Sequence, residues 1–410
     1  MIETKADVSE SSSTSYMATG SNAVQENEIK NNGNNSSDKH CGSILLRKTA
    51  NGVLVFFIIF PLIVTFWRGT WGIMDLLIFP SNIESSAWTC TGLGFGIIFL
   101  YMVVQNCFIQ RLQTESSTLA CLAKTLLLLS VTFVYVLALS TVASWRGVWL
   151  CLDIYFTGRN LSALLTHVFG VIALWATETF TSVISAPGFV VRDCGNQPLI
   201  FNLAIFNCFP SNSPAKKLSV IKTLLNCFVT VCLIGVSLVC YWRGTWTLMI
   251  NSFPEDKTKS SLTCLLVGYT VSISCYCLKD ILRTQLESKK IDRISKFIQF
   301  IFVYFLAFGV VAVWKGFWDL IDFLVATQTT HLELSVIWII CNCVSFILLS
   351  VMNASVNLIG CPAGCRISSK TSLSGFDMGY FLNPRKKVEV KSQVQISAEK
   401  EHIDTKETVM

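Results

Sequence analysis

The sequence predicts an all-α membrane protein with eight transmembrane helices in two parallel four-helix repeats. Hydrophobic residues make up 52% of the 410 residues and charged residues only 14%, a balance typical of multi-pass membrane proteins. Apolar runs of about 20 residues, the length that crosses a bilayer core, recur along the chain. A short tryptophan-rich motif occurs four times, which indicates internal duplication.

The apolar runs place the eight expected helices, each with interfacial flanks that complete a span. They cover residues 52–66, 89–109, 119–144, 161–184, 220–241, 262–278, 297–313 and 334–359. Each motif copy lies between two of these runs, so the chain is expected to consist of four helix–WRGxW–helix units. The expected organisation is a disordered cytoplasmic tail (1–48), a first repeat (49–185), a cytoplasmic linker (186–219), a second repeat (220–360) and a cytoplasmic tail (361–410).

The repeated motif consists of Trp, a basic residue, Gly, any residue and Trp, and in three copies an acid follows eight residues after the first Trp. The third copy lacks the acid: Ile250 stands eight residues after Trp242, and the polar Asn251 follows it. The motif residues are Trp67, Arg68, Gly69, Trp71 and Asp75; Trp145, Arg146, Gly147, Trp149 and Asp153; Trp242, Arg243, Gly244 and Trp246; and Trp314, Lys315, Gly316, Trp318 and Asp322.

These residue types predict a turn at the membrane interface in each copy. Trp favours the headgroup region, where its N–H finds polar partners, and Gly permits the backbone angles of a sharp turn. The acid can pair with the basic residue of its own or of a neighbouring copy. Two interpretations are open: an interfacial anchor with a local ion pair, or a ring of four Arg/Lys–Asp units that lines an outer mouth.

The distribution of Lys and Arg predicts the orientation. The loops on the motif side carry fewer of these residues than the opposite loops and the flanking tails, and basic residues favour the cytoplasmic side. Both tails are therefore expected in the cytoplasm and the motifs outside. The net charge of +6 is attributed to the basic residues that set the orientation in the membrane, and not to nucleic-acid binding. No nucleic-acid motif or secretory signal peptide is recognisable.

The two halves of the sequence align in register, which indicates a parallel duplication about an axis along the membrane normal. FVYVLALSTVASWRGVW at 133–149 matches FVYFLAFGVVAVWKGFW at 302–318. Cys90 and Cys264 begin corresponding helices on the outer side, so they could pair, although free thiols are expected.

Polar residues inside two expected helices suggest a further role. His167 and Glu178 share one stripe of the fourth helix, and Asn342 and Asn353 lie on a similar stripe of the eighth. Such groups either hydrogen-bond helices together or line a water-filled path. Glu178 is the sharpest candidate for a path, because a carboxylate is costly at membrane depth.

The C-terminal region contains two further signals. Cys361 and Cys365 lie next to Arg366 just past the last helix, a setting suited to palmitoylation. The chain ends in KETVM, whose Thr408 and Met410 fit a PDZ ligand. No catalytic, metal-binding or cofactor motif is recognisable, so an enzyme is not expected.

The four WRGxW-type motifs, eight expected spans and parallel halves resemble the Fuseless family of eight-pass membrane proteins of invertebrate neurons. The resemblance covers about 45–360 and is most specific at WRGTW 67–71 and 242–246; WKGFW at 314–318 and Asn251 depart from the pattern. It implies a presynaptic plasma-membrane protein that organises the active zone and positions voltage-gated calcium channels, and it brings no established catalytic or ligand-binding residues. The expected partners are thus membrane lipid from the composition, a PDZ-domain protein from the KETVM terminus, and a calcium-channel complex from the resemblance.

An alternative from another class is a small-molecule transporter or channel that uses the polar stripes of the fourth and eighth helices. Parallel duplication is common among transporters. Against this alternative, no expected span is broken by Gly or Pro at matching midpoints, which is the usual sign of a substrate site.

Overall fold

The computed structural model describes residues 46–364 except 115–118, 157, 194–204, 207, 209–215, 253–255, 288–292 and 326–330. The chain divides into two compact units, and residues 51–381 form the larger one. Of the other unit, residues 1–50 and 382–410, only 46–50 are described. The predicted signals at Cys365, Thr408 and Met410 lie outside the described residues.

The described residues form helices and no β-strand, which confirms the all-α prediction. The elements are η1 (Val55–Ile59), α2 (Phe60–Leu77), α3 (Ile83–Thr114), α4 (Leu119–Tyr155), α5 (Arg159–Ala176), η2 (Phe180–Val183), α6 (Lys216–Phe228), η4 (Val229–Ile234), α7 (Gly235–Ser252), α8 (Lys257–Glu287), α9 (Arg293–Val325), α10 (His331–Val351) and η5 (Ser355–Leu358).

Seven helices in the described part of the chain are long and apolar enough to cross a membrane. They are Leu46–Leu77, Ile83–Gln105, Ser130–Tyr155, Val220–Ser252, Lys257–Leu282, Arg293–Val325 and Glu333–Val351. The apolar stretch Asn160–Ala176 in α5 is shorter. The chain is therefore a helical membrane protein, while the predicted count of eight spans is not confirmed.

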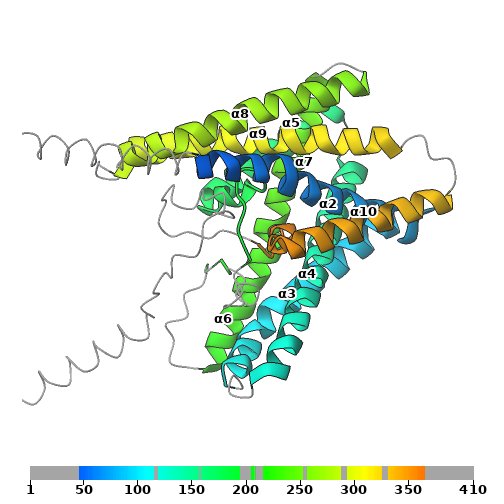
Figure 1. Ribbon diagram of the computed structural model, residues 1–410, viewed down its shortest axis with the longest axis vertical. Coiled ribbons are helices and arrows are strands. Elements are labelled where there is room, and N and C mark those ends of the chain that lie inside the picture. Colours follow the sequence, from blue (N-terminus) through cyan, green and yellow to red (C-terminus); the bar gives the residue numbers. More distant parts are fainter. Residues whose placement is uncertain are drawn as a thin grey trace, which may run out of the picture. The chain divides into compact units, whose positions relative to one another are not determined.

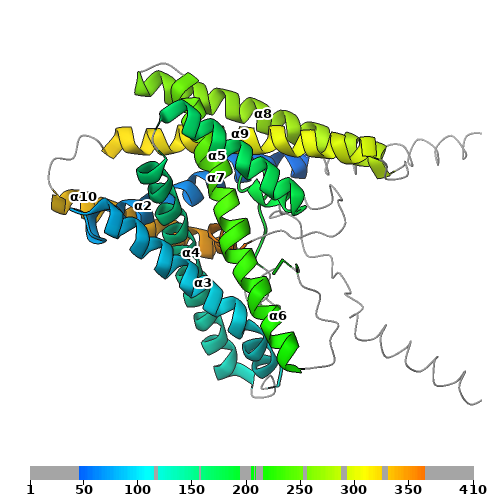
Figure 2. The same ribbon diagram turned by 180° about the vertical axis from the view of Figure 1, so that it is seen from behind.

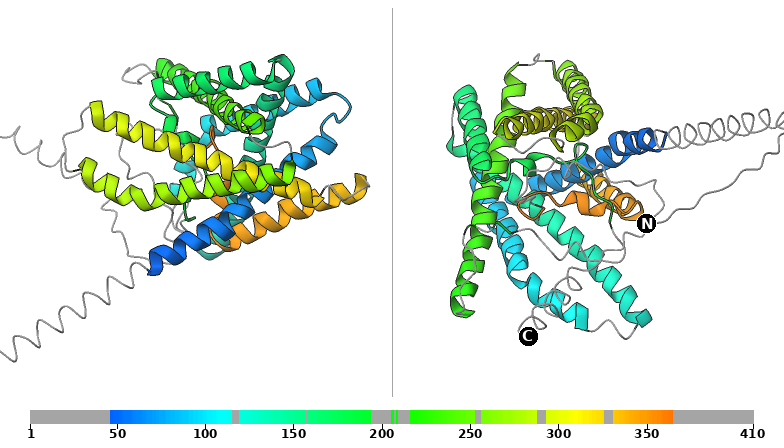
Figure 3. Two further views of the ribbon diagram at one scale, coloured as in Figure 1. Left: turned by 90° about the horizontal axis from the view of Figure 1, so that it is seen from above. Right: turned by 90° about the vertical axis from the view of Figure 1, so that its left-hand side faces the viewer.

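The four motif copies lie on α2, α4, α7 and α9, here called the motif helices. Each motif helix packs against one partner helix: α10 on α2, α3 on α4, α5 on α7 and α8 on α9. Figures 1 and 2 show these pairs, and Figure 3 shows α2 beside α10 in blue and orange. Three of the partner helices precede their motif helices in the sequence, and α10 closes the circle onto α2. The helix pairs are thus shifted by one helix from the expected helix–WRGxW–helix units.

The motifs are continuous with their helices, so the prediction of an interfacial turn at each copy is wrong. Residues 67–71 are helical within α2, and the other three copies are equally helical. The glycines do not adopt the positive φ that a glycine-dependent turn requires. Each glycine instead allows a partner helix to come close.

The helices α5 and α10 both end earlier than predicted. Glu178 and Asn353 follow them with left-handed backbones of φ 54, and each is succeeded by a 3-10 turn and then by Pro187 or Pro362. We call residues 177–187 the first break segment and 352–362 the second. The predicted polar stripes therefore do not continue to Glu178 or Asn353, which are both exposed. The two breaks correspond between the halves, but they lie near the ends of the expected spans 161–184 and 334–359 and not at their midpoints.

The start of the predicted linker belongs to the core. Asn357 accepts a hydrogen bond from the Val191 amide and donates to the Val191 carbonyl, both at 2.7 Å. Asp193 accepts from the Ser355 amide at 2.9 Å and from its hydroxyl at 2.7 Å. Burial raises the pKa of Asp193, and the hydrogen bonds from Ser355 oppose that shift. Residues 190–193 are thus fixed against the second break segment.

Candidate functional site

Each motif glycine lies where the partner helix comes close. A Cβ on Gly147 would lie 2.3 Å from the Thr91 amide nitrogen on α3, and one on Gly244 would lie 2.5 Å from the His167 amide nitrogen on α5. A Cβ on Gly69 would meet the Asn342 amide nitrogen of α10 at 2.9 Å. These contacts follow the small-residue packing of membrane helices, where a missing side chain lets two backbones approach.

The first Trp of every motif copy contributes to a closed ring of four indoles at the centre of the unit. Neighbouring ring centroids are 5.2 to 5.5 Å apart, and neighbouring planes are inclined by 76 to 89°. All four side chains are only 4 to 6% exposed. The members of this first tryptophan ring are Trp67, Trp145, Trp242 and Trp314. Edge-to-face pairs of this kind contribute about 0.5–1.5 kcal/mol each beyond their burial.

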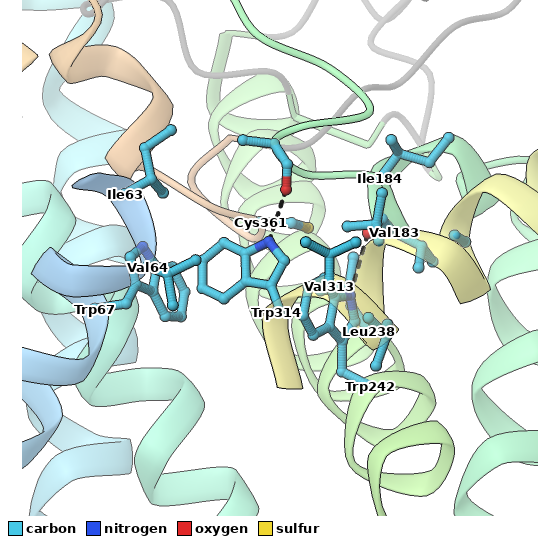
Figure 4. Close-up of a cluster of buried hydrophobic side chains, with 14 of the residues drawn as sticks. Ile63, Val64, Trp67, Val183, Ile184, Leu238, Trp242, Val313, Trp314 and Cys361 are labelled. Carbon is cyan, nitrogen blue, oxygen red and sulfur yellow. Dashed lines mark hydrogen bonds between the residues drawn. The ribbon is translucent and has the colours of Figure 1, made fainter. Parts of the chain in front are cut away.

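Every indole of the first tryptophan ring donates its Nε1–H to a backbone carbonyl of a break segment. The four bonds run from Trp67 to Leu358 (3.1 Å), from Trp145 to Cys361 (2.7 Å), from Trp242 to Val183 (3.1 Å) and from Trp314 to Ala186 (2.7 Å). Figure 4 shows three of these indoles, Trp67, Trp242 and Trp314, beside the break segments. Helix breaks free carbonyls that lipid cannot satisfy, so the indoles supply the donors that the breaks require.

The second Trp of every copy forms another closed ring, one helical turn further along the motif helices. Its centroids are 5.4 to 6.0 Å apart and its neighbouring planes are nearly perpendicular, at 89 to 90°. The members of this second tryptophan ring are Trp71, Trp149, Trp246 and Trp318. These indoles are partly exposed. The two rings join four helices from distant parts of the sequence.

The basic motif residues link neighbouring copies by ion pairs. In each of three pairs, the cation reaches the acid of the adjacent motif helix that comes before it around the circle. The pairs are Arg146–Asp75 (2.9 Å), Arg243–Asp153 (2.8 Å) and Arg68–Asp322 (2.5 Å). The arginine side chains are 5 to 14% exposed and the acids 42 to 45%. The pairing therefore joins different copies.

The fourth ion pair of this circle does not form, because α7 has no acid there: Ile250 stands eight residues after Trp242, and the neighbouring Asn251 carries no charge. Lys315 on α9 bonds instead to Asp319 on its own helix, and the Ser260 hydroxyl lies 3.4 Å from its amine. Asn251 donates to Asn160 at 2.6 Å. The predicted ring of four Arg/Lys–Asp units is thus three inter-helix pairs with a gap between α7 and α9.

Two of the predicted intramembrane polar residues occupy equivalent positions in the halves. Asn342 on α10 accepts from the Tyr135 hydroxyl on α4 and donates to the Thr70 hydroxyl on α2, both at 2.7 Å. His167 on α5 lies 3.1 Å from the Tyr304 hydroxyl on α9 and 2.9 Å from the Thr245 hydroxyl on α7. Each therefore bridges its own motif helix to the next one.

The cysteine predictions have different outcomes. Cys90 and Cys264 are both buried free thiols, as expected, and Cys90 Sγ accepts a hydrogen bond from Arg146 at 3.2 Å. Cys361 is buried and disulfide-bonded. The prediction of palmitoylation at Cys361 is therefore wrong, because its sulfur is neither reduced nor accessible.

A family model named Fuseless matches residues 48–359, which include every motif copy and most of the two break segments. The chain belongs to the Fuseless family. No curated protein and no solved structure matches it. In this Fuseless-family chain, the central site is the first tryptophan ring with the two break segments.

The sequence of this Fuseless-family chain predicts which residues form the motif, but it does not predict which copies contact each other. Tyr135 and Tyr304, which complete the polar bridges, were not singled out. A signal for them was present, because both lie at the same place in the aligned segments 133–149 and 302–318. Thr70 and Thr245 likewise occupy the variable position of WRGTW in the two copies that are identical.

Proposed function

We propose that this chain is a presynaptic plasma-membrane protein that organises the active zone and positions voltage-gated calcium channels there. Membership of the Fuseless family supports the proposal, since the resemblance implies this role. Both tails are proposed to face the cytoplasm, where partners of the release site would be within reach. The protein is proposed to act by binding and holding partners, without catalysis.

The observation that carries this proposal is the filled centre of the helical unit. Four buried indoles meet there edge to face, and each donates to a fixed backbone carbonyl. Closely packed interiors resist gradual deformation. A unit fixed in this way suits a platform that holds partners at constant positions in the membrane, more than a conduit that opens and closes around its axis.

The C-terminal tail is proposed as the element that recruits a PDZ-domain partner through Thr408 and Met410. In such complexes the peptide adds to the domain as a strand, its last side chain enters an apolar pocket and its carboxylate is held by backbone amides. Clustering of the protein would raise the effective concentration of a contact that is weak on its own. Acylation of Cys365 would hold the tail near the membrane.

The proposal is tested in neurons that lack the protein by restoring it with altered tails. A chain that ends at Thr405 and a Thr408→Ala variant should reach the surface normally but fail to cluster calcium channels at terminals. Ser392→Ala, in the same tail, is the matched control and should restore clustering. If the chain ending at Thr405 clusters channels as the full chain does, the tail has no such role. If the full chain restores none, the organising role is contradicted.

A second candidate, a transporter or channel for small molecules, is favoured by the matching breaks. Glu178 and Asn353 have the same φ of 54 at the ends of α5 and α10, and broken helices in corresponding halves are a feature of transporter sites. The exposed Glu178 carboxylate is the group that such a site would use. Flux through reconstituted vesicles that is lost in Glu178→Gln would support this candidate, whereas absence of flux above empty vesicles would count against it.

A further inference from the structure

The two polar bridges have the same hydrogen-bond direction, which determines the tautomer of His167. The Thr70 hydroxyl donates to the Phe66 carbonyl at 2.8 Å, so it accepts from Asn342. The Thr245 hydroxyl donates to the Tyr241 carbonyl at 2.7 Å. Because a hydroxyl has one proton to give, Thr245 must accept from His167. The proton of the neutral imidazole therefore lies on Nδ1.

The other ring nitrogen is then an acceptor. Nε2 of His167 carries no proton in this tautomer, so the Tyr304 hydroxyl, 3.1 Å away, donates to it. The Asn342 side chain has the same polarity, because its oxygen accepts from Tyr135 and its nitrogen donates to Thr70. In the second half of the circle, a neutral imidazole thus takes the place that an amide holds in the first half.

We propose that His167 makes the junction of α5, α7 and α9 sensitive to pH near neutrality, whereas the equivalent junction of α10, α2 and α4, built on Asn342, is insensitive. Asn does not titrate, whereas His changes charge in this range. A doubly protonated imidazole has two donors and no acceptor. Tyr304 would have to stop donating and accept instead.

Among the described residues, no acidic side chain pairs with His167 to neutralise an added charge. The α7 groups that face the imidazole are Thr245 and the Tyr241 ring, at 5.1 Å between centroids, and the α9 group is Tyr304. From η2, the apolar Phe180 packs against Tyr241 and Tyr304. Within the described residues, no charged side chain acts on the imidazole. An unpaired charge in such a site is costly.

The cation nearest in sequence on α7 is already engaged. The Arg243 guanidinium donates to Asp153 at 2.8 Å and to Ser162 at 2.9 Å.

When α5, α7 and α9 are packed together, which we call the closed junction, His167 takes up a proton less readily than it does when these helices separate. As the pH falls, protons therefore favour the separated helices. By linkage, acidification weakens the closed junction and raising the pH strengthens it.

The test compares the thermal stability of the full-length protein in detergent micelles at about pH 7.5 and about pH 5.5, on either side of the ordinary histidine range. The wild type should melt at a lower temperature in acid. His167→Asn copies the bridge of the other half and should lose most of this shift. Asn342→His, the converse variant, should increase it. A shift that His167→Asn leaves unchanged, or that Asn342→His does not increase, overturns the proposal.

A second measurement uses only the wild-type protein, so it does not depend on a variant that folds. The chain has 4 histidines, so histidine labelled with 15N gives few signals in a magnetic resonance spectrum of the wild type. One neutral imidazole should have its proton on Nδ1 at about pH 7.5 and should persist as neutral at a lower pH than the others. If every neutral imidazole has its proton on Nε2, the assigned hydrogen-bond direction is wrong and the proposal is overturned.

Discussion

Arg243 on α7 donates to Asp153 on α4 at 2.8 Å, so the cation of one motif copy is neutralised by the acid of the copy before it. The same displacement by one copy joins Arg146 to Asp75. In the three copies that carry Arg, the cation therefore depends on an acid from another copy. The basic residue and the acid belong to one motif in the sequence and to two different junctions in the folded protein.

The gap in the circle of ion pairs should be repairable. Ile250→Asp places a carboxylate eight residues after Trp242, where the other copies have one, on the motif helix next to the one that carries Lys315. Partly exposed ion pairs contribute about 0.2–1 kcal/mol, so a small rise in thermal stability is expected, and it should diminish at high salt. Ile250→Asn serves as the uncharged control and should show no such rise. A lower melting temperature in the aspartate variant would argue against the geometry of the circle.

The motif glycines should tolerate no side chain. Gly147→Ala would place a methyl group 2.3 Å from the Thr91 amide nitrogen, so α3 and α4 must separate, at a cost of about 1–3 kcal/mol. Gly92 is the matched control on α3, because nothing lies within 4 Å of its added Cβ. Gly92→Ala should leave stability and surface delivery unchanged. Equal effects of the two substitutions would contradict the close packing.

Removal of a single indole N–H from the first tryptophan ring should destabilise the protein. Trp145→Phe keeps an aromatic ring in the first tryptophan ring but leaves the Cys361 carbonyl without its donor. A buried acceptor left unpaired costs about 1–3 kcal/mol. Trp149→Phe removes a similar volume from the second tryptophan ring, where the indole donates no hydrogen bond among the described residues, and should be milder. Denaturation of both variants in detergent gives the comparison.

Labelling of intact cells tests the proposed orientation. The turn between α2 and α3 is exposed at Ser81 and lies on the side expected to face outward. An impermeant thiol reagent should label Ser81→Cys more strongly than the wild type. It should leave Ser392→Cys at the wild-type level until the cells are permeabilised. The opposite pattern would place the tails outside.

Composition and repetition were enough to predict helices, a membrane setting and the motif as the centre of the protein. They did not predict the shape of the motif, because the preferences of Trp and Gly fit a surface turn as well as a packed helix. Gly147 is required by a neighbour, Thr91, that lies 56 residues away in the sequence. Contacts of this kind depend on which helices pair, and the pairing cannot be predicted from the residues around the motif alone.

The gap in the circle of ion pairs is visible in the sequence as a missing acid at Ile250, and the structure shows its consequence at Lys315. The breaks after α5 and α10 were not visible, because apolar residues such as Phe180 and Val183 continue past them. A signal is present in Pro187 and Pro362, one of which follows each break a few residues on, but prolines just past an apolar run are equally expected in a linker or a tail.

The central claim is that the motif copies are joined to one another in a circle, and a double-mutant cycle on the ion pairs tests it most directly. Arg146→Gln is combined in turn with Asp75→Asn and with Asp153→Asn, and the free energy of unfolding is measured for each single and double variant. Contacting residues couple by about 0.5–3 kcal/mol, and separate ones add within about 0.5 kcal/mol. The structure predicts coupling of Arg146 to Asp75 and near-additivity with Asp153. Coupling to Asp153, the acid of its own copy, without coupling to Asp75 would contradict the circle.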